Sequence, residues 1–176
     1  PKQEGTTDED LFGSIDSYGL DGTLLQELGI NWSMTPRCHS WRERVKQHLD
    51  VSQTKSYLSH NRRDELRSRR QWGGTGIMSY GKLAHFAMGA GEDKTKLGRW
   101  TWTRYRGKNG TSFRVVSLYR PHTFNRQSAG GVQAQHRRYL RSINDYRDPR
   151  KAFLQDFEKE LKEWIICLHV LIKIQE

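Results

Sequence analysis

Two side chains and a glycine turn supply residue types that could together hold a metal ion and a phosphate group. Glu27 ends a short apolar run, and a glutamate fixed at a strand end offers the hard oxygen ligands that Mg²⁺ prefers. Tyr119 ends a second run, rich in valine, and its phenol could donate a hydrogen bond to a phosphate oxygen. Gly73 and Gly74 lie between them in the chain, and glycine tolerates the positive φ of a tight turn.

The hydrophobic pattern predicts the elements that would position these residues. The alternation from Arg99 to Tyr105, the Gly-Lys-Asn-Gly turn and the run from Ser112 are typical of a β-hairpin. Asp148 followed by Pro149 predicts a helix start, because an acid caps the first turn and proline fits there. We further expect strands at 20–27, 75–79 and 168–174, helices at 40–49 and 132–143, and loops at 52–70 and 89–98.

The chain of 176 residues carries a net charge of +10, which is unevenly distributed. Residues 1–30 hold seven acids and one Lys, whereas residues 94–151 hold fifteen Lys or Arg and two acids. Arg predominates, and its guanidinium can bind phosphate oxygens through two parallel hydrogen bonds. The charge therefore favours a polyanionic partner, most simply DNA or RNA, although a solvated basic face on any small domain would look the same.

Length and composition are typical of one domain that does not enter a membrane. No apolar run approaches the roughly 18 residues needed to span a bilayer, and the acidic start has no secretory signal. The two cysteines lack metal-binding spacing and are typical of a reducing compartment. We expect an intracellular protein, cytoplasmic or nuclear, with a flexible acidic lead-in at 1–14 and a folded domain at 15–176.

Several short motifs follow one another in the order found in a known superfamily. They are Gln26-Glu27, Gly73-Gly74-Thr75, Leu97-Gly98-Arg99-Trp100, Tyr119-Arg120-Pro121, Gln135-His136-Arg137-Arg138-Tyr139 and Asp148-Pro149-Arg150. Through these motifs the chain resembles the endonuclease/exonuclease/phosphatase superfamily, which is related in fold to DNase I and to apurinic endonucleases. The resemblance covers roughly residues 15–172, and it is strongest to versions associated with retrotransposon-like elements.

The resemblance implies an α/β fold, here a partial two-sheet sandwich of the DNase I-like type with helices packed outside. It also implies Mg²⁺-dependent hydrolysis of a nucleic-acid phosphodiester, with Mn²⁺ as the alternative cation. Glu27 would bind the metal, and Tyr119 would contact the scissile phosphate as a catalytic residue. Arg120 would help to stabilise the charge on that phosphate.

A predicted basic helix adds further candidate contacts to nucleic acid. Arg137, Arg138 and Arg141 lie close together in the sequence and could meet backbone phosphates. An ordinary solvated helix face would show the same pattern. Among nucleic acids, we favour DNA over RNA as the partner.

The superfamily pattern is incomplete in this sequence. A Gly-Asp-x-Asn motif is expected near residue 172, but Gln175 stands about where its Asp belongs, and no Ser-Asp-His motif follows. Because the Gln side chain cannot act as a base, we expect cleavage by this chain alone to be weak or absent. The alternatives are a catalytically inactive basic remnant that binds nucleic acid, and a decayed open reading frame without a selected function.

Overall fold

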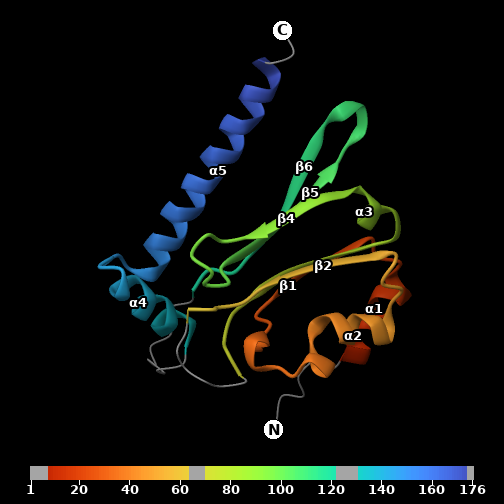
Figure 1. Ribbon diagram of the computed structural model, residues 1–176, viewed down its shortest axis with the longest axis horizontal. Helices are drawn as coiled ribbons and strands as arrows, with labels where there is room; N and C mark the ends of the chain where they lie inside the picture. Colours follow the sequence, from red (N-terminus) through yellow and green to blue (C-terminus); the bar gives the residue numbers. More distant parts are fainter. Residues whose placement is uncertain (1–7, 64–69, 122–130, 174–176) are drawn as a thin grey trace. The chain divides into compact units, whose positions relative to one another are not determined.

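The computed structural model describes residues 8–63, 70–121 and 131–173 of the chain. The chain divides into two compact units, Pro1–Tyr119 and Arg120–Glu176, and each unit is described by itself. Within the described residues, the first unit contains two β-sheets and three α-helices, and the second contains two α-helices (Figure 1).

The first sheet has three antiparallel strands in the order β1-β3-β2. β1 spans Gly22–Gln26, β2 spans Thr54–Ser59 and β3 spans Thr75–Tyr80. Every residue of β3 is buried, because this strand lies between the other two and both of its faces are covered. β1 and β2 are edge strands, so each pairs with β3 alone among the described strands.

The second sheet contains β4 (Ala87–Glu92), β5 (Trp100–Arg106) and β6 (Ser112–Leu118), antiparallel and in that order. β5 and β6 form the hairpin that the alternating sequence predicted, and a 3₁₀ turn, η3, joins them. Gly91 lies opposite Trp102 on β5. A Cβ atom at this position would come within 2.7 Å of the indole, so the close approach of the two strands requires glycine.

The two sheets pack face to face through a layer of hydroxyl groups. The residues that bear these hydroxyls are almost fully buried, so their bonds to one another replace bonds to water. Because each bond joins one particular pair, this hydroxyl layer fixes the register of one sheet on the other. The bonds join Thr75 to Thr101 (2.9 Å), Ser79 to Tyr105 (2.5 Å) and Ser117 Oγ to the carbonyl oxygen of Leu25 (2.8 Å).

Two helices lie on the other face of the first sheet (Figure 1). α1 spans Asp8–Tyr18 and α2 spans Trp41–His48. Their apolar side chains pack against β3, and this contact forms the main apolar core of the first unit. The core residues are Phe12, Ile15, Val45, Met78 and Tyr80.

Short helical turns connect these elements. η1 (Trp32–Met34) and η2 (Arg37–His39) lead from β1 to α2, and α3 (Gly81–Phe86) joins β3 to β4. Asn31 caps η1, because its side-chain oxygen accepts a hydrogen bond from the N–H of Ser33 at 3.2 Å. The cap therefore fixes the start of η1 at Trp32.

The second unit contains α4 (Val132–Ser142) and α5 (Pro149–Lys173). Asp148 caps α5 as predicted, because its carboxylate accepts a hydrogen bond from the N–H of Arg150 at 2.9 Å. Arg147 forms ion pairs with Asp145 and Asp156, which connect the segment between the helices to α5. No helix in the described part of the chain is long and apolar enough to cross a membrane.

The structure confirms a mixed α/β fold with two small antiparallel sheets, and it corrects three predicted elements. β2 lies inside the predicted loop 52–70. The strand was not predicted because its sequence is largely polar and lacks hydrophobic alternation. β4 runs from Ala87 into the predicted loop 89–98, and Gly91 is the glycine that its approach to β5 requires. α5 continues to Lys173 where a strand was predicted at 168–174, since no Gly or Pro interrupts the helix.

The predicted boundary between a flexible lead-in and the folded domain, after residue 14, falls inside α1. Phe12 is 3% exposed and Ile15 is 4% exposed, so this helix contributes to the core on both sides of that boundary. Residues 1–7 lie outside the described residues.

The hydroxyl layer can be tested with a matched pair of substitutions. Thr103 is fully buried, and its hydroxyl has no hydrogen-bond partner within the described residues. We expect Thr103→Val to raise the free energy of unfolding by about 1 kcal/mol, because it removes a buried unpaired hydroxyl. Thr101→Val should lower it by about 1–3 kcal/mol, because it leaves the Thr75 hydroxyl unpaired. Urea unfolding at unchanged m-value measures the free energy of unfolding of both variants. Equal changes in the two variants would contradict the role given to the hydroxyl layer.

Candidate functional site

Glu27 lies where β1 ends and the chain turns. It has φ 54°, in the left-handed region that residues other than glycine rarely adopt, and its side chain is exposed. This conformation costs a non-glycine residue roughly 1 kcal/mol. Such backbone conformations are concentrated at functional sites, where a particular side chain is needed. The conformation of Glu27 therefore makes its carboxylate a candidate functional group.

Gly73 and Gly74 form the predicted turn beside this strand end. Both have φ 93°, and the N–H of Gly29 donates a hydrogen bond to the carbonyl oxygen of Gly73 at 3.2 Å. A Cβ atom on Gly74 would lie 3.1 Å from the carbonyl oxygen of Ser59. The two glycines thus allow the backbone conformation of the turn that leads into β3.

Tyr119 directly follows β6 and is held by a loop built on a buried acid. Its N–H donates to the carbonyl oxygen of Arg99 at 2.8 Å. Arg99 in turn donates its own N–H to Asp93 Oδ2 at 3.0 Å, and its guanidinium lies 3.6 Å from Asp93 Oδ1. Asp93 is 0% exposed, and it also accepts a hydrogen bond from the N–H of Leu97 at 3.2 Å. The Asp93 carboxylate therefore organises the loop that positions Tyr119.

The structure brings Tyr119 and Glu27 together. Ser117, two residues before Tyr119, donates a hydrogen bond to the carbonyl oxygen of Leu25, two residues before Glu27. Continuing each strand by two residues from this bond leads to the two predicted site residues. The Tyr119 phenol lies close enough to the Glu27 carboxylate for that carboxylate to raise the pKa of the phenol.

The surroundings of Tyr119 keep its phenol protonated. Burial, together with the hydrogen bond to Glu27 and the charge of that carboxylate, raises the pKa of Tyr119 well above its ordinary value of 10.0. The tyrosinate is disfavoured because it would lose hydration and face a second negative charge. At neutral pH, Tyr119 is therefore a hydrogen-bond donor, and a tyrosinate nucleophile is excluded.

Glu27 is the carboxylate that this site offers to a cation. No group of three or more His, Cys, Asp or Glu side chains in the described ranges is arranged to hold a metal ion. Mg²⁺ is often bound through one or two carboxylates, while water and a substrate phosphate supply the other ligands. The oxygen donors present fit a cation shared with a phosphate, and they do not fit a metal held by protein ligands alone.

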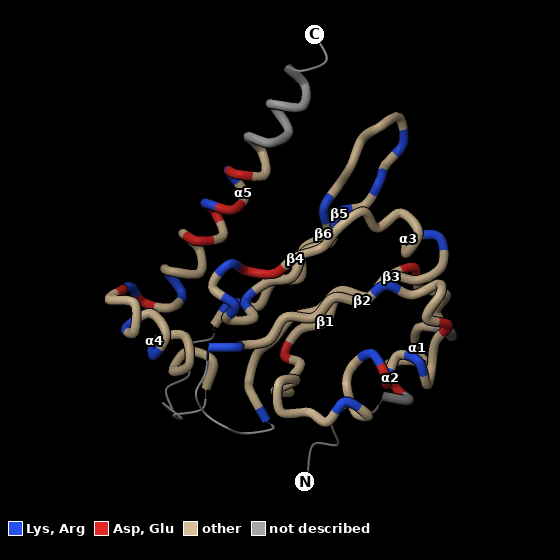
Figure 2. The backbone as a smooth tube through the Cα atoms, in the orientation of Figure 1, with Lys and Arg blue, Asp and Glu red and all other residues tan. Residues whose placement is uncertain are grey.

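The four arginines predicted to contact phosphate lie in the second unit. Arg120 directly follows Tyr119 and is exposed. On α4, Arg138 and Arg141 are exposed and Arg137 is partly buried. α4 contains no acidic residue, whereas acids and bases are interspersed along α5 (Figure 2). The arginines of α4 therefore form a basic group of their own.

Sequence analysis missed two acids that support the site. Asp93 was assigned to a loop without a role. Its neighbour Glu92 accepts a hydrogen bond from Ser59 Oγ at 2.7 Å and pairs with Arg62 at 2.9 Å, which connects β4 to β2. The available signal was the Glu-Asp pair itself, since it immediately precedes a long segment that is almost free of acids.

Comparisons of the chain with family models, with curated proteins and with solved structures found no match. The superfamily resemblance therefore stays a prediction. The geometry of Glu27 and Tyr119 is the observation on which a function can be proposed.

The contact between Tyr119 and Glu27 can be tested by titration. We expect Glu27→Gln to lower the pKa of Tyr119, because the substitution removes the negative charge beside the phenol while burial remains. Tyr80, with a pKa of about 12, serves as an internal reference that should not change. The ¹³Cζ shifts of the tyrosines report both values. Identical titration of Tyr119 in the two proteins would show that the side chains are not in contact.

Proposed function

We propose that this protein is a phosphodiesterase-like domain that binds a nucleic-acid phosphodiester with the help of Mg²⁺, or of Mn²⁺ in its place. The observation that carries the proposal is the proximity of the Tyr119 phenol to the Glu27 carboxylate, each two residues beyond the bond that joins Ser117 to Leu25. It supports the proposal because a cation ligand and a proton donor lie side by side, which is what a cation-bound phosphate needs. The proposal assumes a partial DNase I-like sandwich.

The two side chains would have complementary roles. Glu27 would hold the cation, which would polarise a phosphoryl oxygen and offset its charge. Tyr119 would donate a hydrogen bond to a second oxygen of the same phosphate. Once the carboxylate of Glu27 is engaged by a cation, it accepts less strongly from the phenol, and the phenol becomes available to the phosphate. Arg120, the next residue, would add positive charge.

Binding is the activity that these two residues support directly. Hydrolysis also needs a group that accepts a proton from water, and Tyr119 cannot serve because its phenol stays protonated. Cleavage by an activated water is therefore the further expectation of the superfamily resemblance. We expect DNA to be preferred over RNA.

A second candidate function is binding of nucleic acid through charge alone. The observation that favours it is the acid-free helix α4, with Arg137, Arg138 and Arg141 within a stretch of five residues. Phosphate contacts of this kind release counterions, so the affinity would fall steeply with salt. Such binding would require neither Glu27 nor a divalent cation.

The proposal is tested by titrating a fluorescent oligodeoxynucleotide with and without Mg²⁺ at fixed ionic strength. We expect Mg²⁺ to strengthen binding by the native protein and Glu27→Gln to abolish that gain. Tyr119→Phe should weaken the Mg²⁺-dependent complex about tenfold, because a hydrogen bond to a charged acceptor contributes about 1.5 kcal/mol.

Glu158→Gln is the matched control, because Glu158 is an exposed glutamate of α5 paired with Lys162. It should keep the Mg²⁺ response. The proposal would be wrong if neither Mg²⁺ nor either site substitution changed the affinity. A steep loss of affinity with salt in the same experiment would then favour the second candidate function. Product analysis on the same samples shows whether the oligonucleotide is cleaved.

A further inference from the structure

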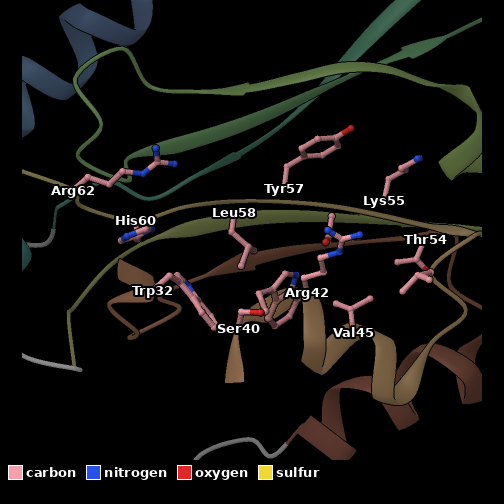
Figure 3. Close-up of a pocket in the computed structure, with 13 residues that line it drawn as sticks. Trp32, Ser40, Arg42, Val45, Thr54, Lys55, Tyr57, Leu58, His60 and Arg62 are labelled. Atoms are coloured by element: carbon pink, nitrogen blue, oxygen red, sulfur yellow. The ribbon is translucent and has the colours of Figure 1, made fainter. Parts of the chain in front are cut away.

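A groove follows the free edge of β2 (Figure 3). Its volume is about 590 Å³, and its lining comes from η1, α2 and β2 itself. Trp32, Trp41, Val45 and Leu58 supply its apolar part. The two indoles meet edge to face with their ring centroids 5.9 Å apart, which gives this wall a defined shape.

The side chains of β2 divide the groove into two sides. Leu58 lies on the side of Trp32 and Val45, whereas Lys55 and Tyr57 point to the opposite side of the strand (Figure 3). Side chains of any strand alternate in this way. A chain laid beside β2 would therefore place its own side chains alternately against the apolar wall and beside Lys55.

The backbone of β2 is available along this groove. β2 pairs with β3 alone among the described strands, so the backbone N–H and C=O groups on its other side can pair with an added chain. The strand has six residues, which gives an edge of about 20 Å. Extended peptides bind to exposed sheet edges through such backbone groups, while pockets for alternate side chains provide specificity.

The charge of the groove selects among the chains that could bind there. Arg42, Lys55 and Arg62 line it, and no Asp or Glu does. Arg62 is paired with Glu92, whereas Arg42 and Lys55 are exposed. A second copy of β2 would bring the same cations together, so self-pairing is disfavoured. An acidic chain would complement the charge.

We propose that this groove binds an extended acidic peptide with apolar residues at alternate positions, as an additional strand beside β2. Its apolar side chains would contact Trp32 and Leu58, and its acidic side chains would lie beside Lys55. A single-stranded nucleic acid would match the charge but could not continue the backbone ladder of the sheet. The proposal does not depend on Glu27 or Tyr119, so it can fail or hold independently of the proposed function.

The test uses a fluorescent, end-blocked heptapeptide that alternates valine and glutamate. Fluorescence polarisation should show saturable binding, and a valine–lysine peptide should bind about tenfold more weakly or not at all. Two further versions of the peptide carry backbone N-methyl groups on the valines or on the glutamates. Because alternate N–H groups face β2, one version should lose binding and the other should keep it.

Paired substitutions in the protein locate the site. Replacing Arg42 and Lys55 with Glu should reverse the preference between the acidic and basic peptides, while Lys159→Glu, an exposed position on α5, should not. Unchanged unfolding midpoints establish that the variants fold. Equal binding of the two N-methylated peptides, no binding of any peptide, or binding of a single-stranded oligonucleotide in place of the peptide would overturn the proposal.

Discussion

The hydroxyl layer between the two sheets is the constraint on which the position of Glu27 and Tyr119 depends. Apolar faces attract each other without direction, so they can shift relative to one another at little cost. Hydrogen bonds between buried hydroxyls allow only particular pairs. The bond from Ser117 to the carbonyl oxygen of Leu25 lies two residues before Tyr119 on one strand and two residues before Glu27 on the other. A shift of register would separate the two site residues.

A strained backbone position and a buried charge lie in the segments that hold these two residues. Glu27 and Lys96 have positive φ although neither is glycine, as do Asn109 and Asn144 in turns elsewhere among the described residues. Asp93 lies fully buried with Arg99, whose carbonyl oxygen holds the backbone of Tyr119. A buried ion pair is weak evidence for stability, because removing two charges from water is costly. Its structural effect here is to fix the loop before β5, and thereby Tyr119.

Elements with strong local signals were predictable from sequence. The β5–β6 hairpin has clean alternation and a turn of glycine and asparagine, and α5 begins at an Asp-Pro pair. β2 and β4 were not predicted because tertiary packing, and not a local sequence pattern, determines both strands. β2 is largely polar, and β4 contains Gly91 because the strand must approach Trp102 closely. The candidate pair came from the order of motifs, since no periodicity connects residues so far apart. The supporting role of Asp93 depends on tertiary contacts, which sequence patterns do not show.

The central claim is that Glu27 and Tyr119 form one site for a divalent cation and a phosphate. The most direct measurement is a crystal structure of the protein soaked with Mn²⁺ and a dinucleotide, with anomalous data collected to locate the metal. We expect a single strong anomalous peak within coordination distance of the Glu27 carboxylate and a phosphate oxygen within hydrogen-bonding distance of the Tyr119 hydroxyl. A metal bound elsewhere, or a phosphate held only by the arginines of α4, would contradict the account.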